Sequence, residues 1–79
     1  MTIKIYGPGC SRCHELERRV RRAVEELGVP AEVQKISDFK EIAAAGVIAT
    51  PGLAVDGRLK STGRIPTLDE IKAWIQEGA

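Results

Sequence analysis

A three-residue break, Gly7-Pro8-Gly9, separates two stretches of opposite character and constrains the fold more than any other feature of the chain. Residues 2–6, before the break, are mostly β-branched or aromatic, which is typical of a strand. From Ser11 onward, apolar residues recur at helical spacing until Gly28 ends the pattern. This apolar stripe consists of Cys13, Leu16, Val20, Ala23, Val24 and Leu27. A strand therefore leads, through a tight turn, directly into a long amphipathic helix.

The next segment adds a second strand and a shorter helix. Residues 31–36 alternate in polarity as a strand, and strand, helix and strand in this order form a right-handed parallel unit. Ser37 and Asp38 are both candidates to cap a helix that continues to about Ala45 and is closed by Gly46.

Two further strands and a last helix complete the chain. Residues 52–55 and 58–62 flank Asp56-Gly57, a pair that favours a type I′ hairpin turn. Thr67 and Glu70 form the capping-box pattern that opens a helix, and its inward-facing residues are expected to be Leu68, Ile71, Trp74 and Ile75. The order βαβαββα predicts an α/β fold, a single domain over residues 1–79, with helices on both faces of a mixed four-stranded sheet.

Charge and hydropathy argue against two classes of partner. A formal net charge of +1 does not supply the concentrated basic face that nucleic acid requires. No apolar run approaches the roughly 20 residues that cross a membrane, and the N-terminus lacks the basic start and apolar stretch of an export signal. We therefore expect a cytoplasmic protein that binds neither nucleic acid nor membrane. We also expect it to be a monomer.

The tetrapeptide Cys10-Ser11-Arg12-Cys13 stands where the first strand turns into the first helix. A disulfide across so short a loop would stabilise the fold little, which favours a catalytic or metal-binding pair over a structural one. Unpaired backbone N–H groups and the helix dipole favour an anion at this position, so the pKa of the Cys10 thiol is expected to be lowered. Residues three apart on a helix are spaced somewhat wider than a relaxed disulfide prefers, which makes a disulfide there easier to reduce.

Position also assigns different roles to the two cysteines. Cys10 lies at the loop edge, where it is exposed and able to attack a disulfide. Cys13 begins the apolar stripe, so we expect it to be buried, less ionised and the resolving thiol. Arg12 and His14 add cationic character beside the sulfurs and are candidates for tuning their pKa values.

The dipeptide Thr50-Pro51 directly precedes the predicted third strand. Taken with Cys-x-x-Cys after the first strand and the βαβαββα order, it makes nearly the whole chain resemble a minimal thioredoxin- or glutaredoxin-type protein, like the small redox-active disulfide proteins of archaea and bacteria. The resemblance implies a thioredoxin-like fold in which Pro51 is cis and packs against the disulfide, while the backbone of Thr50 pairs with a substrate peptide.

The same resemblance implies an activity and a set of partners. The chain would be a thiol–disulfide oxidoreductase that acts on protein disulfides without a cofactor or a metal. Its electron donor would be a thioredoxin-reductase-like flavoprotein or a ferredoxin-linked reductase.

Four features of the chain depart from the patterns of the two families. Thioredoxins carry Trp before the first cysteine and Gly-Pro between the two, where this chain has Gly9 and Ser11-Arg12. They also have a buried carboxylate in the strand that leads to the site, where this chain has Lys4, so deprotonation of Cys13 would need another route. The Gly-Gly-type turn with which glutaredoxins bind glutathione is reduced to Gly63 followed by Arg64.

The main alternative is a soft-metal carrier, because two thiolates also suit Cu(I) or Zn(II). Heavy-metal-associated domains place Cys-x-x-Cys at a similar strand–helix junction, but in the order βαββαβ and with Met at the position of Pro8. His14 completes the Cys-x-x-Cys-His pattern of c-type haem attachment, yet Met1 is the only methionine and His14 the only histidine, which leaves a second axial ligand hard to supply.

Overall fold

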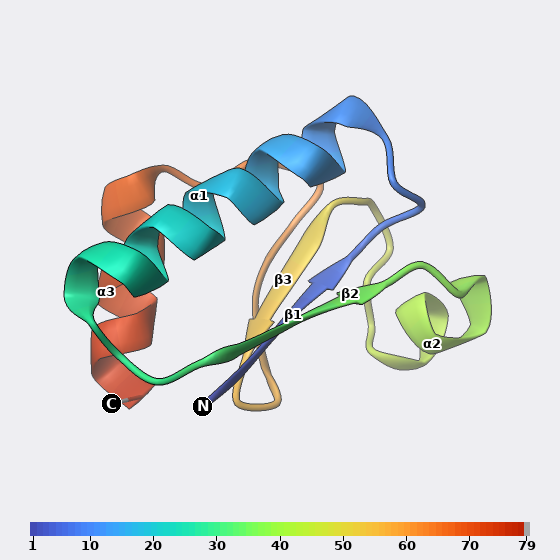
Figure 1. The fold of residues 1–79 in the computed structure, drawn as a ribbon. Helices are drawn as coiled ribbons and strands as arrows, with labels where there is room; N and C mark the ends of the chain where they lie inside the picture. The colour runs from blue at the N-terminus through green and yellow to red at the C-terminus, as the bar shows by residue number, and fades with distance from the viewer. Residues whose placement is uncertain (79) are drawn as a thin grey trace.

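The computed structural model describes residues 1–78, and its elements confirm the predicted order βαβαββα (Figure 1). The strands are β1 (Thr2–Tyr6), β2 (Glu32–Ile36), β3 (Gly52–Val55) and β4 (Arg58–Thr62). The helices are α1 (Ser11–Leu27), α2 (Phe39–Ala44) and α3 (Leu68–Gly78).

The four strands form one mixed sheet in the order β2-β1-β3-β4. β1 runs parallel to β2 and antiparallel to β3, and β4 is antiparallel to β3. Register pairs Tyr6 with both Ile36 and Gly52, and Gly52 with Thr62. These four residues therefore form one row across the sheet, and the segments that follow or precede them meet at the same edge.

Helices α1 and α3 pack together on one face of the sheet (Figure 1). The main core lies between these helices and the strands, and consists of Ile3, Ile5, Leu16, Val20, Ala23, Leu53, Ile71 and Ile75. Every one of these side chains is almost completely removed from solvent, and burial of apolar surface on this scale is the dominant favourable contribution to folding. α1 ends where Gly28 adopts a left-handed φ of 65° and donates its N–H to the carbonyl of Val24.

The shorter helix α2 covers the opposite face, so the prediction of helices on both faces is confirmed. A second core forms there from Tyr6, Ile42, Val47 and Ala54. Of the two predicted caps, Asp38 is the one used: its Oδ1 accepts the N–H of Lys40 at 3.2 Å.

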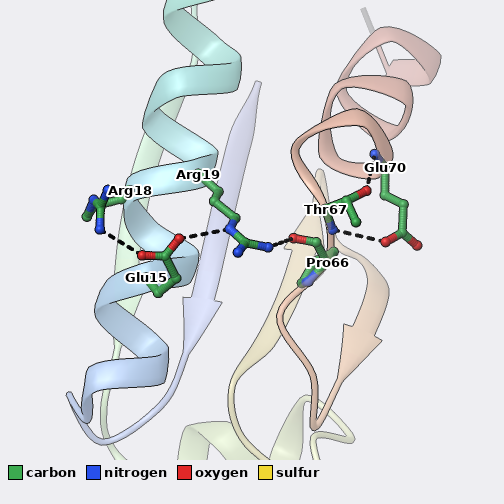
Figure 2. A network of polar contacts seen from close by, with 6 residues as sticks. All are labelled: Glu15, Arg18, Arg19, Pro66, Thr67 and Glu70. Carbon is green, nitrogen blue, oxygen red and sulfur yellow. Dashed lines mark hydrogen bonds and ion pairs between the residues drawn. The ribbon is translucent and has the colours of Figure 1, made fainter.

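The two turn signals at the end of the chain are confirmed by local geometry. Asp56 and Gly57 both have positive φ, at 49° and 81°, as a type I′ turn requires. Before α3, Thr67 Oγ1 accepts the N–H of Glu70, and Glu70 Oε1 accepts the N–H of Thr67 (Figure 2). This reciprocal pair is a complete capping box.

A polar network ties α1 to the connection between β4 and α3 (Figure 2). Glu15 accepts hydrogen bonds from Arg18 at 2.8 Å and from Arg19 at 2.9 Å, and Arg19 also donates to the carbonyl of Pro66 at 3.0 Å. Four arginines of α1 thus form ion pairs along the helix: Arg18, Arg19, Arg21 and Arg22. No helix within residues 1–78 has both the length and the apolar character needed to cross a bilayer.

Candidate active site

The site lies at the sheet edge beyond the row formed by Tyr6, Ile36, Gly52 and Thr62. The segment from Gly7 to Cys10 leaves β1 there, and Thr50-Pro51 enters β3 at the same edge. The Cys-x-x-Cys and Thr-Pro motifs, far apart in sequence, are therefore brought together by the pairing of β1 with β3.

The two cysteines are free thiols of contrasting exposure, as the sequence predicts. Cys10 occupies the N-cap of α1 and is exposed, whereas Cys13 lies one turn into the helix and is only 6% exposed. Their sulfurs are 3.3 Å apart, within hydrogen-bond distance for thiols. When the pair is oxidised, with loss of two electrons and two protons, a small approach of the sulfurs is enough for a disulfide to form.

The surroundings shift the pKa values of the two thiols in opposite directions. The backbone N–H of Cys13 makes the largest contribution to lowering the pKa of Cys10, and the Cys13 thiol adds to it. No backbone N–H reaches the Cys10 sulfur with full hydrogen-bond geometry, so the contribution comes from N–H dipoles that face it at the start of the helix. Burial raises the pKa of Cys13, and its hydrogen bond to Cys10 raises it further. Of the two thiols, Cys10 is therefore the one that ionises first, while Cys13 keeps its proton.

Gly7 is required by the packing of Cys13, a constraint that the sequence did not reveal. A Cβ atom at this position would lie 2.2 Å from the Cys13 sulfur, far inside van der Waals contact. The φ of Gly7 lies outside the left-handed region, so the glycine is needed for space and not for backbone freedom. In the sequence it appeared only as part of the turn.

The bond between Thr50 and Pro51 is cis, as the family resemblance implied. Pro51 is fully buried and Thr50 is half-buried. The Cβ of Thr50 is 3.9 Å from the place where a Gly7 Cβ would lie, which brings the Thr-Pro segment close to the contact between Gly7 and Cys13.

Arg12 and His14 are both exposed beside the cysteines, but they make different hydrogen bonds. The Arg12 guanidinium donates from Nη2 to the carbonyl of Gly63 at 2.8 Å. The contribution of Arg12 to the lowered pKa of Cys10 comes from its backbone N–H. The backbone N–H of His14 donates to the carbonyl of Cys10 and begins the helix.

Gly63 connects the Cys-x-x-Cys motif to the Thr-Pro motif. This link was not predictable from the sequence. Gly63 accepts the Arg12 hydrogen bond, and its N–H donates to the carbonyl of Pro51 at 3.0 Å. Its φ is 75°, and a Cβ there would come within 3.1 Å of the Ala49 side chain. A glycine is therefore needed at this crossing for both conformation and space.

A pocket of about 310 Å³ opens beside Cys13 and includes the side chains of His14, Glu17 and Lys35. Glu17 follows Cys13 by one helical turn, and its carboxylate is 3.4 Å from Lys35 Nζ. A hydrogen bond from Arg21 lowers the pKa of Glu17 most, and Lys35 lowers it further. The carboxylate near Cys13 is thus supplied by α1, whereas position 4 of β1 holds a lysine.

Residues 1–76 match the family model described as thioredoxin domain. The chain belongs to the thioredoxin family. It is 53% identical over 72 residues to a thioredoxin of Methanothermobacter thermautotrophicus, a match that covers 91% of this chain and 94% of that protein. A thioredoxin of Methanocaldococcus jannaschii is 44% identical over 72 residues, covering 91% of this chain and 83% of the relative.

Membership in the thioredoxin family confirms the predicted fold and the predicted class of activity, a thiol–disulfide oxidoreductase. The observed order βαβαββα also differs from the βαββαβ order of heavy-metal-associated domains. The chain therefore does not have the fold on which the metal-carrier alternative was based.

Proposed function

We propose that Cys10 is the attacking thiol and Cys13 the resolving thiol in the reduction of protein disulfides. The observation that carries the proposal is the contrast between the two sulfurs: one is exposed with a lowered pKa, and the other, 3.3 Å away, is buried with a raised pKa. Only the thiolate is a nucleophile, so the exposed sulfur, whose pKa is lowered, is both the reachable and the more reactive of the two.

The reaction consists of two exchanges. The Cys10 thiolate attacks one sulfur of the substrate disulfide, a bond forms between Cys10 and the substrate, and the other substrate sulfur leaves with the electron pair as a thiolate. Cys13 then gives up its proton, to the first substrate thiolate or to water, and attacks the Cys10 sulfur, which releases the second substrate thiolate. The substrate gains two electrons and the protein is left with a Cys10–Cys13 disulfide.

Thr50 and Pro51 are proposed to form the substrate-docking edge. Among the described residues, neither the N–H nor the carbonyl of Thr50 is hydrogen-bonded to another backbone group. Both are thus available to an extended peptide that pairs with this segment as an added strand. Ile48, two residues before Thr50, is 95% exposed and gives such a peptide an apolar surface to contact.

The remaining parts of the proposal concern the cellular setting. The protein acts as a single-domain monomer in the cytoplasm, uses no cofactor, and is re-reduced by a thioredoxin-reductase-like flavoprotein or a ferredoxin-linked reductase. A reducing compartment would suit this cycle, because the Cys10–Cys13 disulfide must be reopened after each turnover.

Reduction of insulin disulfides in the presence of dithiothreitol tests the function. The wild-type protein and Ser11→Ala, a control for an exposed position of the same tetrapeptide, should both accelerate insulin precipitation. Cys10→Ser should be inactive. Negligible activity of the wild type, together with tight and cysteine-dependent Cu(I) binding in competition with a chelator, would instead support a metal carrier.

A further inference from the structure

The Arg12 guanidinium reaches from the Cys-x-x-Cys turn to the segment that follows β4. Arg12 belongs to the Cys-x-x-Cys turn, and its Nη2 donates to the Gly63 carbonyl at 2.8 Å. The N–H of Gly63 in turn donates to the carbonyl of Pro51 at 3.0 Å. By way of Gly63, the side chain therefore links the turn that carries the attacking cysteine to Pro51 of the proposed docking edge.

The charge of Arg12 is not neutralised by a neighbour. Within residues 1–78, Arg12 and Arg58 are the two arginines without a carboxylate within ion-pair distance; those with such a partner are Arg18, Arg19, Arg21, Arg22 and Arg64. Arg58 lies at the β3–β4 hairpin, away from the cysteines. Arg12 is exposed, and the Gly63 carbonyl is the one acceptor that its side chain has among the described residues.

A guanidinium has five N–H donors in a planar fork that matches the geometry of a carboxylate. The bond to Gly63 restricts the orientation of the exposed Arg12 group and leaves its other donors without a partner among the described residues. Because this orientation is already restricted, binding a carboxylate there costs less side-chain entropy than binding to a freely moving arginine.

We infer that Arg12 determines specificity, by favouring substrates that carry an acidic residue next to the disulfide that Cys10 attacks. The inference rests on the proposed function, since it concerns the first exchange of that reaction. Arg12 is not needed for the chemistry, and a neutral substrate is still reduced at a lower rate.

Two short synthetic peptides provide the test. Each contains one cysteine as a mixed disulfide with 2-thiopyridine, and the residues that flank the cysteine are glutamate in one peptide and glutamine in the other. Attack by Cys10 forms a bond to the peptide sulfur and expels thiopyridone, whose absorbance gives the rate constant. Cys13 then displaces the peptide thiol, and the loss of both protein thiols reports completion.

The measured quantity is the ratio of the two rate constants, acidic peptide over neutral peptide. A change in the pKa of Cys10 alters both rate constants alike and leaves this ratio unchanged. The wild type should prefer the acidic peptide about two- to fivefold, in line with an exposed ion pair, and the preference should fall with added salt. Arg12→Gln should bring the ratio close to one, and Arg12→Lys should give an intermediate value.

Arg58→Gln is the matched control, because it removes the same charge from an arginine that also lacks a carboxylate partner but lies at the hairpin. It should keep the wild-type ratio. Equal ratios for the wild type and Arg12→Gln would overturn the inference, even if both proteins reduce the peptides. If neither peptide is reduced with closure of the Cys10–Cys13 disulfide, the proposed function itself fails and the inference with it.

Discussion

At the scale of single residues, one turn of helix gives the two cysteines opposite properties. The first turn of α1 directs backbone N–H groups toward Cys10 at the N-cap and carries Cys13 into the core. The same thiol contact then stabilises the anion on one sulfur and the proton on the other. The chemistry of the site thus follows from where the helix begins.

Alkylation of the reduced protein by iodoacetamide should show this difference. Cys10 should react faster than Cys13, and its rate should fall only when the pH drops below its lowered pKa. In Cys13→Ala the pKa of Cys10 should rise only part of the way to its ordinary value, because the backbone N–H at position 13 is the largest contribution and is retained. Faster alkylation of Cys13 at every pH would contradict the assignment of roles.

Gly7 offers a second test at this scale. Gly7→Ala places a Cβ where the Cys13 sulfur now lies, so the sulfur or the backbone must move. We expect a loss of about 1–3 kcal/mol in the free energy of unfolding, measured with urea on the reduced protein. In a Cys13→Ala background the loss should be much smaller, because the atom that clashes is absent. Equal losses in both backgrounds would mean that the strain arises elsewhere.

Residue roles were predictable where they depend on local position, and not where they depend on tertiary contacts. The exposure of Cys10 and the burial of Cys13 follow from a loop edge and an apolar stripe, both visible in the sequence. Gly7 and Gly63 are required by atoms that only the folded structure brings against them, the Cys13 sulfur and the Ala49 side chain. Nothing in the local pattern distinguishes such a glycine from one in an ordinary turn.

At the scale of elements, the start of α3 combines a capping box with an ion pair. Glu70 accepts the N–H of Thr67 and forms a two-point contact with Arg64, at 2.8 and 3.0 Å. The Arg64 hydrogen bond is the main reason that the pKa of Glu70 is lowered to about 2. The ionised carboxylate therefore helps to join the β4–α3 connection to the helix.

This pKa shift has a defined effect on the pH dependence of stability. Because folding lowers the pKa of Glu70, its contribution is fully present above the ordinary glutamate pKa and is lost as the pH falls toward about 2. Urea unfolding of the wild type and Glu70→Gln between about pH 6 and pH 2 should show the stability difference shrinking with acidification. Glu77→Gln, at an exposed position of the same helix, serves as the control. A difference that stays constant with pH would contradict the account.

Elements were predictable where turn and cap residues carry a specific signal. Asp56-Gly57 and the pair Thr67 and Glu70 behave as their sequence patterns indicate. The irregular register between Leu53 and Ala54 in the β3–β4 pair was not predictable, nor was the buried hydroxyl of Ser61, which has no hydrogen-bond partner in the described structure. Neither feature corresponds to a turn or cap signal in the sequence.

At the scale of the whole molecule, the strand order β2-β1-β3-β4 assembles the site. Placing β3 beside β1 puts the Thr50-Pro51 segment next to the Cys10–Cys13 turn, and β4 brings Gly63 to both. The order of elements was predictable from periodicity and turns, but this neighbour relationship came only from the resemblance to thioredoxins. Local patterns do not specify which strands become neighbours.

The central claim, that Cys10 attacks and Cys13 resolves, is tested most directly by trapping the mixed disulfide. Cys10→Ser and Cys13→Ser are each mixed with a protein substrate that contains one disulfide, and the products are separated without reducing agent. We predict that Cys13→Ser accumulates a covalent complex through Cys10, because the second exchange is blocked, and that Cys10→Ser forms none. A stable complex formed by Cys10→Ser through Cys13, with none from Cys13→Ser, would contradict the claim.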